Sequence, residues 1–208
     1  MKTIVLKLDK NEPNTESLKR AVDVLKSGGL VIFPSDTVYG IAANAFISTA
    51  REQIYKLKGR SFDKPLILMA DNIGSLRAVV DIHEKAEKIA EQFWPGPLTL
   101  ICHTTNLGKM VMGGRHNCGA RIPKDKTLLK LLKLCSFPLA TTSANPSSKP
   151  SAKSGKEAGK YFDGKVDVIL DAGKTTLGKE STVIDATHFP FVVLREGCLH
   201  KSELLKYI

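Results

Sequence analysis

The sequence predicts an α/β fold in which helices flank one mixed sheet. Short apolar runs of strand type alternate with amphipathic helical patterns along the whole chain of 208 residues. Hydrophobic residues make up 42% and charged residues 25%, which is typical of a globular protein with a buried core. The connections between the runs vary too much in length for a strict strand–helix–strand repeat. We therefore expect one domain over residues 1–208, with a mixed sheet.

The first elements follow from alternation and from helix-ending signals. Residues 3–8 alternate between polar and apolar side chains, as a strand does. Thr15 is expected to cap a helix whose apolar side chains recur at helical spacing. Gly28 is expected to end it, because glycine tolerates the left-handed conformation at a helix C-terminus. Residues 30–33 form an apolar run typical of a buried strand.

The rest of the chain continues this succession of strands and helices. Ser48 is expected to cap a second helix, which Gly59 ends. Further strands are expected at residues 65–69, 98–102, 118–122, 138–142, 166–170, 181–184 and 192–194. Further helices are expected at residues 83–93, 127–134, 154–162 and 202–207.

Targeting signals and cysteine usage favour a cytoplasmic protein. No apolar run approaches the roughly 20 residues that span a bilayer, so we expect no membrane partner. Residues 1–14 lack the apolar segment of a signal peptide. The cysteines form no C-x-x-C pair and have no zinc-finger spacing, so we expect reduced, buried side chains and no metal ligands. They are Cys102, Cys118, Cys135 and Cys198.

An excess of positive charge predicts an anionic partner. The formal net charge is +10, and residues 124–165 contain nine lysines against three acidic residues. Such a basic surface favours nucleotide phosphates, RNA, or both. For any single lysine, a solvated surface position is the better interpretation.

Polar clusters follow several of the predicted strands, where an α/β fold presents its ligand sites. They span residues 34–40, 58–65, 141–146, 180–185 and 194–197. The clusters offer hydroxyls, an amide and fixed cations, whereas all five histidines lie outside them. This composition argues against serine, cysteine and zinc hydrolases and suits phosphate chemistry, in which positioning and electrostatics dominate. The sequence has neither a P-loop nor a dinucleotide-binding glycine motif.

A nucleotide would therefore be held by side chains. Lys58, Arg60 and Lys64 are candidates for its phosphates, since arginine grips oxygens through a planar fork and lysine acts as a point charge. Ser143 and Asn145 are the neutral partners. We expect Lys58 and Arg60 at an exposed turn after a helix, where substitution changes stability little.

Seven motifs in a fixed order carry a family resemblance. They are GGLVIFPSDTVYGI (28–41), KGRSFDKPL (58–66), WPGPLT (94–99), ARIP (120–123), TSAN (142–145), STVID (181–185) and LREG (194–197). The set resembles the YrdC/TsaC family of L-threonylcarbamoyladenylate synthases. The resemblance implies a twisted, mostly parallel sheet with a basic groove, in the short single-domain form.

The resemblance also implies an activity. The family joins L-threonine, bicarbonate or CO2, and ATP into threonylcarbamoyl-AMP and releases pyrophosphate, and we expect Mg²⁺ to accompany ATP. A separate threonylcarbamoyl transferase complex then modifies the adenosine beside the anticodon of certain tRNAs, giving t6A.

Site roles are implied at the matching positions of this sequence. Threonine would be bound by Thr37, Arg121, Thr141 and Ser181. ATP would be bound by Arg60, Lys64, Ser143, Asn145, Ser151 and Arg195. Lys58 and Arg60 would be catalytic. We assign no general base, because Asp36 of the first cluster suits a role in the turn equally well.

Other functions stay open at this point. Lys153, Lys156 and Lys160 would share one helix face, which suits a module that binds tRNA or double-stranded RNA without synthase activity. Few aromatic residues are available for single-strand stacking, at 6% of the chain. A carbamoyltransferase of hydrogenase maturation is a second alternative, although such proteins are much longer. An inactive paralogue is a third.

Overall fold

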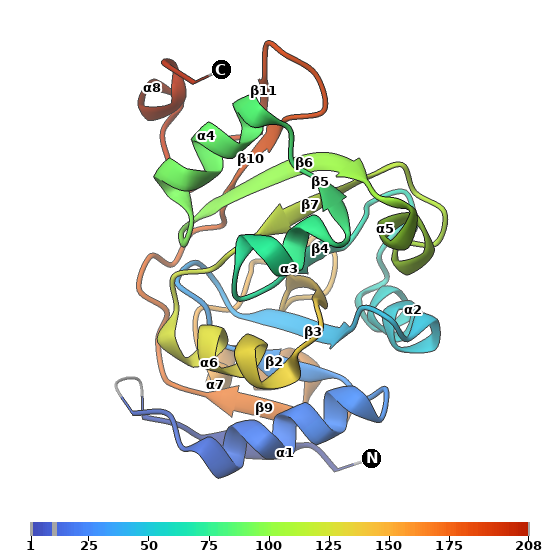
Figure 1. Ribbon diagram of the computed structural model, residues 1–208. Coiled ribbons are helices and arrows are strands. Elements are labelled where there is room, and N and C mark those ends of the chain that lie inside the picture. The colour runs from blue at the N-terminus through green and yellow to red at the C-terminus, as the bar shows by residue number, and fades with distance from the viewer. Residues whose placement is uncertain (1, 10–11, 208) are drawn as a thin grey trace.

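A single large sheet runs through the protein (Figure 1). The structure, a computed structural model, describes residues 2–9 and 12–207. Its strands are β1 (Ile4–Lys7), β2 (Val31–Phe33), β3 (Gly40–Asn44), β4 (Ile67–Met69), β5 (Val80–Asp81), β6 (Leu98–Thr104), β7 (Asn117–Arg121), β8 (Leu139–Ser143), β9 (Val168–Asp171), β10 (Thr182–Asp185) and β11 (Val192–Arg195). Its helices are α1 (Thr15–Lys26), α2 (Ser48–Lys58), α3 (Ile73–Arg77), α4 (Glu84–Phe93), α5 (Asn106–Val111), α6 (Lys126–Cys135), α7 (Gly155–Phe162) and α8 (Lys201–Leu204).

The sheet is mixed, as expected. Its strand order is β1-β9-β2-β3-β8-β4-β7-β6-β10-β11, and β5 pairs with β6 beside this path. Of the ten strand pairings among the described residues, four are parallel and six are antiparallel. The expectation of a mostly parallel sheet is therefore wrong. Short loops join β2 to β3 and β10 to β11, and such loops return the chain in the antiparallel direction.

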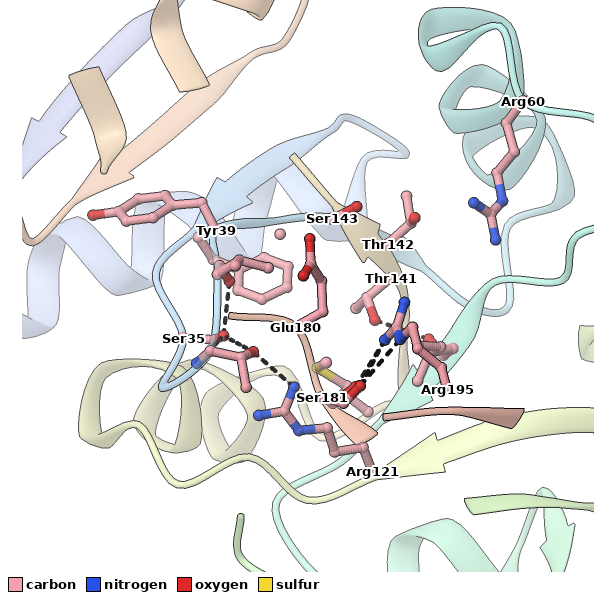
Figure 2. Close-up of a pocket in the computed structure, with 16 residues that line it drawn as sticks. Ser35, Tyr39, Arg60, Arg121, Thr141, Thr142, Ser143, Glu180, Ser181 and Arg195 are labelled. Carbon is pink, nitrogen blue, oxygen red and sulfur yellow. Dashed lines mark hydrogen bonds between the residues drawn. The ribbon is translucent and has the colours of Figure 1, made fainter. Parts of the chain in front are cut away.

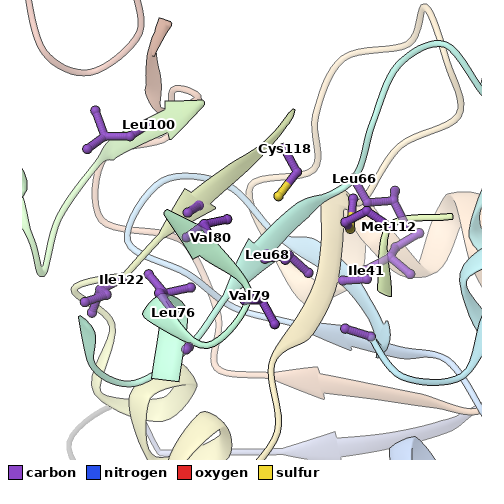
Figure 3. Close-up of a cluster of buried hydrophobic side chains, with 14 of the residues drawn as sticks. Ile41, Leu66, Leu68, Leu76, Val79, Val80, Leu100, Met112, Cys118 and Ile122 are labelled. Carbon is purple, nitrogen blue, oxygen red and sulfur yellow. The ribbon is translucent and has the colours of Figure 1, made fainter. Parts of the chain in front are cut away.

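Helices cover both faces of the sheet, and each face has its own apolar cluster. Val31 and Phe33 of β2 pack with α1 and α6 on one face. Ile32, between them, belongs to the larger cluster on the other face, because side chains alternate along a strand. Figure 3 shows part of this larger cluster, where Ile41, Leu68 and other labelled side chains converge. Buried on both faces, the central strands provide a rigid base for the loops at their ends.

Most sequence-based elements are confirmed, with different caps. Asn14 caps α1, where Thr15 was expected, because its side chain accepts hydrogen bonds from two free N–H groups of the first turn. Ser48 is the first residue of α2 and not its cap. Gly28 and Gly59 end these helices with φ of 83° and 58°, as expected.

Several short elements were not predicted. They are β3, α3, β5 and α5. The last predicted helix is shorter than expected, since α8 ends at Leu204. Three of the cysteines are buried, Cys198 is half-buried, and all are free thiols. Within the described ranges, no helix combines the length and the apolar character needed to cross a bilayer.

Candidate active site

A pocket opens where the loop after β2 meets strands β4, β7, β8 and β11 (Figure 2). It encloses about 610 Å³, part of which is open to solvent. Its wall includes predicted site residues from six separate segments, namely Thr37, Arg60, Arg121, Thr141, Ser143, Ser181 and Arg195. The tertiary structure thus gathers residues that lie up to 158 positions apart in the sequence (Thr37 to Arg195).

The loop after β2 carries a chain of hydrogen bonds that starts at Arg121. Arg121 Nη1 donates to Thr37 Oγ1 at 2.9 Å. Ser35 Oγ lies 2.9 Å from Thr37 Oγ1 and donates its own proton to the carbonyl of Val38 at 2.8 Å. Because a hydroxyl has one proton, Thr37 is the donor to Ser35. The chain orients the hydroxyl of Thr37, a residue that is 2% exposed.

Arg121 is held in place by an ion pair with Asp36. Arg121 Nη2 lies 2.7 Å from Asp36 Oδ1, and Arg121 Nε donates to the carbonyl of Gly96 at 2.9 Å. Burial lowers the pKa of Arg121, and the neighbouring Asp36 opposes this change. A guanidinium has five N–H groups and three are used in these contacts, so two remain for a ligand. Asp36 therefore has a structural contact that the sequence did not indicate.

Thr141 and Ser181 provide two more hydroxyls on the pocket wall. Thr141 Oγ1 donates to the carbonyl of Ile67 at 3.0 Å. Ser181 Oγ lies 2.9 Å from Thr99 Oγ1 and accepts from Arg195 Nη2 at 3.3 Å. Each hydroxyl is fixed by the protein and still has acceptor capacity toward the pocket.

Arg195 reaches Ser181 because two backbone segments lie in direct contact. Its Nε and Nη2 donate to the Ser181 carbonyl at 3.1 and 2.9 Å. The glycine of the LREG motif permits this approach, because a Cβ at Gly197 would lie 2.2 Å from the carbonyl oxygen of Glu180. No side chain larger than hydrogen fits there without a backbone shift.

Lys58 does not lie at an exposed turn, and this expectation is wrong. Its side chain is folded inward and the residue is 4% exposed. The ammonium group donates to the carbonyls of Ser143 and Asn145 and, at 3.3 Å, to Asn145 Oδ1. The helix end therefore connects α2 to the loop after β8, and Lys58 does not line the pocket. Burial, with a smaller effect of Arg60, lowers the pKa of Lys58 to about 7.

Arg60 and Lys64 lie on the loop that follows α2. Arg60 is half-buried and donates to the carbonyls of Lys64 and Pro65 at 2.9 and 3.0 Å, which shapes the loop. Burial lowers the pKa of Arg60. Lys64 is exposed and lies outside the pocket wall. Only Arg60 of this pair reaches the pocket.

Asn145 and Ser151 shape the far end of the loop after β8. Asn145 is 8% exposed and donates to the carbonyls of Pro146 and Lys149. Ser151 Oγ lies 3.5 Å from Asn145 Oδ1. Neither residue lines the pocket in this structure. Their predicted contact with ATP stays a prediction.

Glu180 lines the pocket and was missed as a candidate. A hydrogen bond from Ser151, together with the positive charges of Arg195 and Lys153, lowers its pKa despite partial burial. The signal was present, because Glu180 opens the fourth polar cluster of the sequence. It was overlooked because a single glutamate on a loop is usually a solvated residue.

The structure also bears on metal binding and on the RNA-binding alternative. Over the ranges that the structure describes, no three His, Cys, Asp or Glu side chains gather to hold a metal ion. Lys153, Lys156 and Lys160 are exposed around α7, as the RNA-binding alternative requires. Exposed lysines alone do not distinguish RNA binding from ordinary solvation.

Comparison with known proteins identifies relatives. Residues 23–197 match the Sua5/YciO/YrdC family, described as telomere recombination. A threonylcarbamoyl-AMP synthase of Pyrococcus abyssi is 40% identical over 193 residues, which cover 92% of this chain and 57% of that protein. One of Bacillus subtilis is 35% identical over 199 residues, which cover 94% of this chain and 58% of that protein.

A solved structure shows the same fold. The crystal structure of P. abyssi Sua5 complexed with L-threonine has a TM-score of 0.94 and 38% identity, and the match covers 99% of this chain and 61% of that chain. The chain thus spans about three fifths of the length of these relatives.

Proposed function

Because this chain belongs to the Sua5/YciO/YrdC family, we propose that it synthesises threonylcarbamoyl-AMP. The substrates are L-threonine, bicarbonate or CO2, and ATP, and the second product is pyrophosphate. The reaction transfers an adenylyl group, so the enzyme is a nucleotidyltransferase. The matched relatives named above carry this activity in their names.

The observation that carries the proposal is the arrangement of Arg121 among three hydroxyls. Arg121 is 3% exposed, lines the pocket, and has two N–H groups outside its protein contacts. A guanidinium fork binds a carboxylate with two parallel hydrogen bonds. The hydroxyls of Thr37, Thr141 and Ser181 line the same pocket and can bind a hydroxyl of the ligand. This set is complementary to a hydroxy amino acid, and the relative in the superposed structure binds L-threonine.

Other residues of the pocket wall suit the phosphates of ATP. Arg60 and Arg195 contribute guanidinium groups, and Ser143 adds a hydroxyl (Figure 2). Arg195 already donates to Ser181, so it links the two substrate regions. Fixed cations are needed at this boundary, because a carbamate and a triphosphate repel each other.

The chemistry requires two successive bonds. The ammonium group of threonine first loses a proton to water; the neutral amine then attacks CO2, forms an N–C bond and loses a second proton, giving a carbamate. A carbamate oxygen then attacks the α-phosphorus of ATP, and the bond from that phosphorus to the pyrophosphate oxygen breaks. Arg121 and the hydroxyls orient the amino acid, while Arg60 and Arg195 offset the charge of the phosphates. Holding the two reactants in line removes several kcal/mol of entropic barrier, about 7 or more in well-oriented cases.

Mg²⁺ stays a prediction. The described side chains form no cluster that could hold a metal ion alone. A magnesium ion that enters with ATP is held chiefly by phosphate oxygens and water.

Our proposal places the product upstream of tRNA modification. A carbamic–phosphoric mixed anhydride is an activated carbamoyl donor, so a transferase must consume it. We propose that this is the threonylcarbamoyl transferase complex that forms t6A in tRNA, and that the chain acts in the cytoplasm as one domain over residues 1–208. The RNA-binding alternative predicts a different result in the experiment below.

Pyrophosphate release tests the proposed activity. We expect release only when ATP, L-threonine and bicarbonate are all present. Release that persists without threonine would contradict the proposal, and RNA binding without any release would favour the alternative function.

L-Valine is the matched control substrate for the hydroxyl-binding groups. It has nearly the shape of threonine and lacks the hydroxyl, which leaves polar groups of the pocket unpaired. We expect kcat/KM to fall on the order of 10⁴-fold with valine and by roughly 10- to 200-fold with serine, which keeps the hydroxyl. Equal use of valine and serine would show that the hydroxyls do not select the substrate.

A further inference from the structure

Glu180 is the acidic side chain on a pocket wall whose other charged residues are all arginines. Those arginines are Arg60, Arg121 and Arg195. Figure 2 shows the Glu180 carboxylate projecting into the middle of the pocket, between the loop that carries Ser35 and strand β8. Asp36 accepts from Arg121 and from the backbone N–H of Lys124 at Oδ1 alone, its Oδ2 is buried without a hydrogen-bond partner among the described residues, and the residue does not line the pocket. Glu180 is therefore the one side chain on the described pocket wall that can attract a cationic group of a ligand.

The backbone that carries Glu180 is fixed on several sides. The N–H groups of Leu177 and Gly178 donate to the carbonyls of Asp36 and Thr37 at 2.9 and 3.0 Å, which joins this segment to the loop after β2. The carbonyl of Glu180 accepts from the N–H of Cys198 at 2.9 Å. Glu180 is thus presented to the pocket by a segment tied to the Thr37 loop and to the end of β11.

The carboxylate of Glu180 is ionised at neutral pH. Ser151 donates a hydrogen bond to it, and the charges of Arg195 and Lys153 lower its pKa further. A fixed anion repels the phosphates of ATP and any carboxylate that enters the pocket. Its presence is favourable where the ligand also brings a cation.

L-Threonine brings such a cation. At neutral pH an amino acid carries an ammonium group beside its carboxylate, and an ammonium taken out of water without a partner is strongly unfavourable. Arg121 matches the carboxylate and the three hydroxyls match the side chain, but none of these groups is an anion. Glu180 completes the set.

Building on the proposed function, we propose that Glu180 binds the ammonium group of the substrate amino acid. The pocket then recognises three features of its ligand separately: the carboxylate at Arg121, the hydroxyl at Thr37, Thr141 or Ser181, and the amine at Glu180. Glu180 becomes a specificity residue that selects α-amino acids over the corresponding α-hydroxy acids, which have no amine to join to CO2.

A binding experiment with two ligands tests this role. Calorimetry would compare L-threonine with (2S,3R)-2,3-dihydroxybutanoate, in which a hydroxyl replaces the amine, in the presence of α,β-methylene-ATP. We expect Glu180→Gln to weaken L-threonine binding roughly 10- to 100-fold, the size of a lost charge-assisted hydrogen bond. Binding of the hydroxy acid should stay the same or improve, because its carboxylate no longer faces an anion.

Three variants separate this role from a structural one. Glu180→Asp keeps the charge and should retain most of the preference for L-threonine. Glu84→Gln, on the exposed surface of α4, makes the same charge change far from the pocket and should leave both affinities unchanged. Equal weakening of both ligands by Glu180→Gln would overturn the proposal, as would unchanged threonine binding.

A magnesium titration of pyrophosphate release provides a further arm. We expect Glu180→Gln to leave the required Mg²⁺ concentration unchanged while raising KM for threonine. A higher Mg²⁺ requirement with unchanged KM for threonine would instead make Glu180 a metal ligand and overturn the proposal. Failure of the proposed function is distinguishable, because the unsubstituted protein would then release no pyrophosphate when ATP, L-threonine and bicarbonate are all present.

Discussion

Two buried cations, Arg121 on the pocket wall and Lys58 outside it, have different surroundings. Arg121, 3% exposed, faces the carboxylate of Asp36, whereas Lys58, 4% exposed, donates to carbonyl and amide oxygens that carry no formal charge. Burial therefore lowers the pKa of Lys58 to about 7, while the Arg121 guanidinium keeps its proton because arginine starts from a far higher value. With nearly equal burial, Arg121 therefore stays charged, whereas Lys58 can lose its proton near neutral pH.

This difference suits Arg121 and Lys58 to two different roles. A permanent charge with free N–H groups suits the binding of a substrate carboxylate. A lysine whose three donors are used by the loop after β8 acts as a positioning residue for Ser143 and Asn145. Its charge is stabilised when phosphates approach, since an anion favours the protonated form.

The largest expected effect concerns the ion pair. Arg121→Met leaves Asp36 buried without its cation and should lower the free energy of unfolding by about 3–5 kcal/mol in urea titrations. The double variant Asp36→Asn/Arg121→Met removes both charges and should recover most of that loss. If the double variant were as unstable as Arg121→Met, the uncompensated charge of Asp36 would not be the cause of the lost stability.

A smaller loss of stability is expected when Lys58, which donates to uncharged oxygens, is replaced. Lys58→Met leaves the carbonyls of Ser143 and Asn145 without their donor and should lower the unfolding free energy by about 1–3 kcal/mol. KM for ATP should rise with it, because the loop that carries Ser143 is released. Lys56→Met, on the exposed side of α2, is the matched control and should change stability by less than about 0.5 kcal/mol.

The titratable charge of Lys58 predicts a pH dependence. Its pKa is about 7 in the folded state and 10.5 in the unfolded state, so between these values the unfolded chain binds more protons. Stability should therefore rise with pH in this range, by at most about 1.4 kcal/mol per pH unit. The measurement is the difference in unfolding free energy between the unsubstituted protein and Lys58→Met, at pH values from about 7 to 8.5. A difference that stays constant over this range would refute the titration.

Lys64 is an exposed cation, and its replacement should change stability the least. Lys64→Ala should shift stability by less than about 0.5 kcal/mol, because its side chain is exposed. If Lys64 contacts phosphate only when ATP binds, KM for ATP rises by roughly 10-fold while the melting temperature stays the same. Unchanged KM would remove Lys64 from the nucleotide-binding set.

Much of the fold could be predicted because its signals are local. Strand β9 is a run of apolar, strand-forming residues and helix α6 has a clear helical periodicity, so local sequence identifies both, and Gly59 marks the end of α2. Strand β3 was missed because its sequence, GIAAN, is rich in glycine and alanine, which have weak strand preference. It becomes a strand because it pairs with β2 on one side and β8 on the other. Pairing partners of this kind lie outside any local window.

The site shows the same division between local and long-range information. Ser143 was indicated by a polar motif directly after a strand, and it lines the pocket. The inward turn of Lys58 was not predictable, because it depends on the carbonyl of Asn145, 87 residues later in the chain. Glu180 could not be recognised as a site residue from the sequence, because its role depends on Ser151 and on the arginines that surround it in the folded protein.

By itself, the sequence determined the fold class, the family resemblance and seven of the sixteen residues that line the pocket. These depend on apolar periodicity, turn signals and ordered motifs, all of which are properties of contiguous residues. Only the tertiary structure decided that antiparallel pairs outnumber parallel ones, that Lys58 is a buried clamp, and that Asp36 faces Arg121. The physical reason is that desolvation and ion pairing depend on which distant segments meet, and those contacts exist only once the sheet has formed.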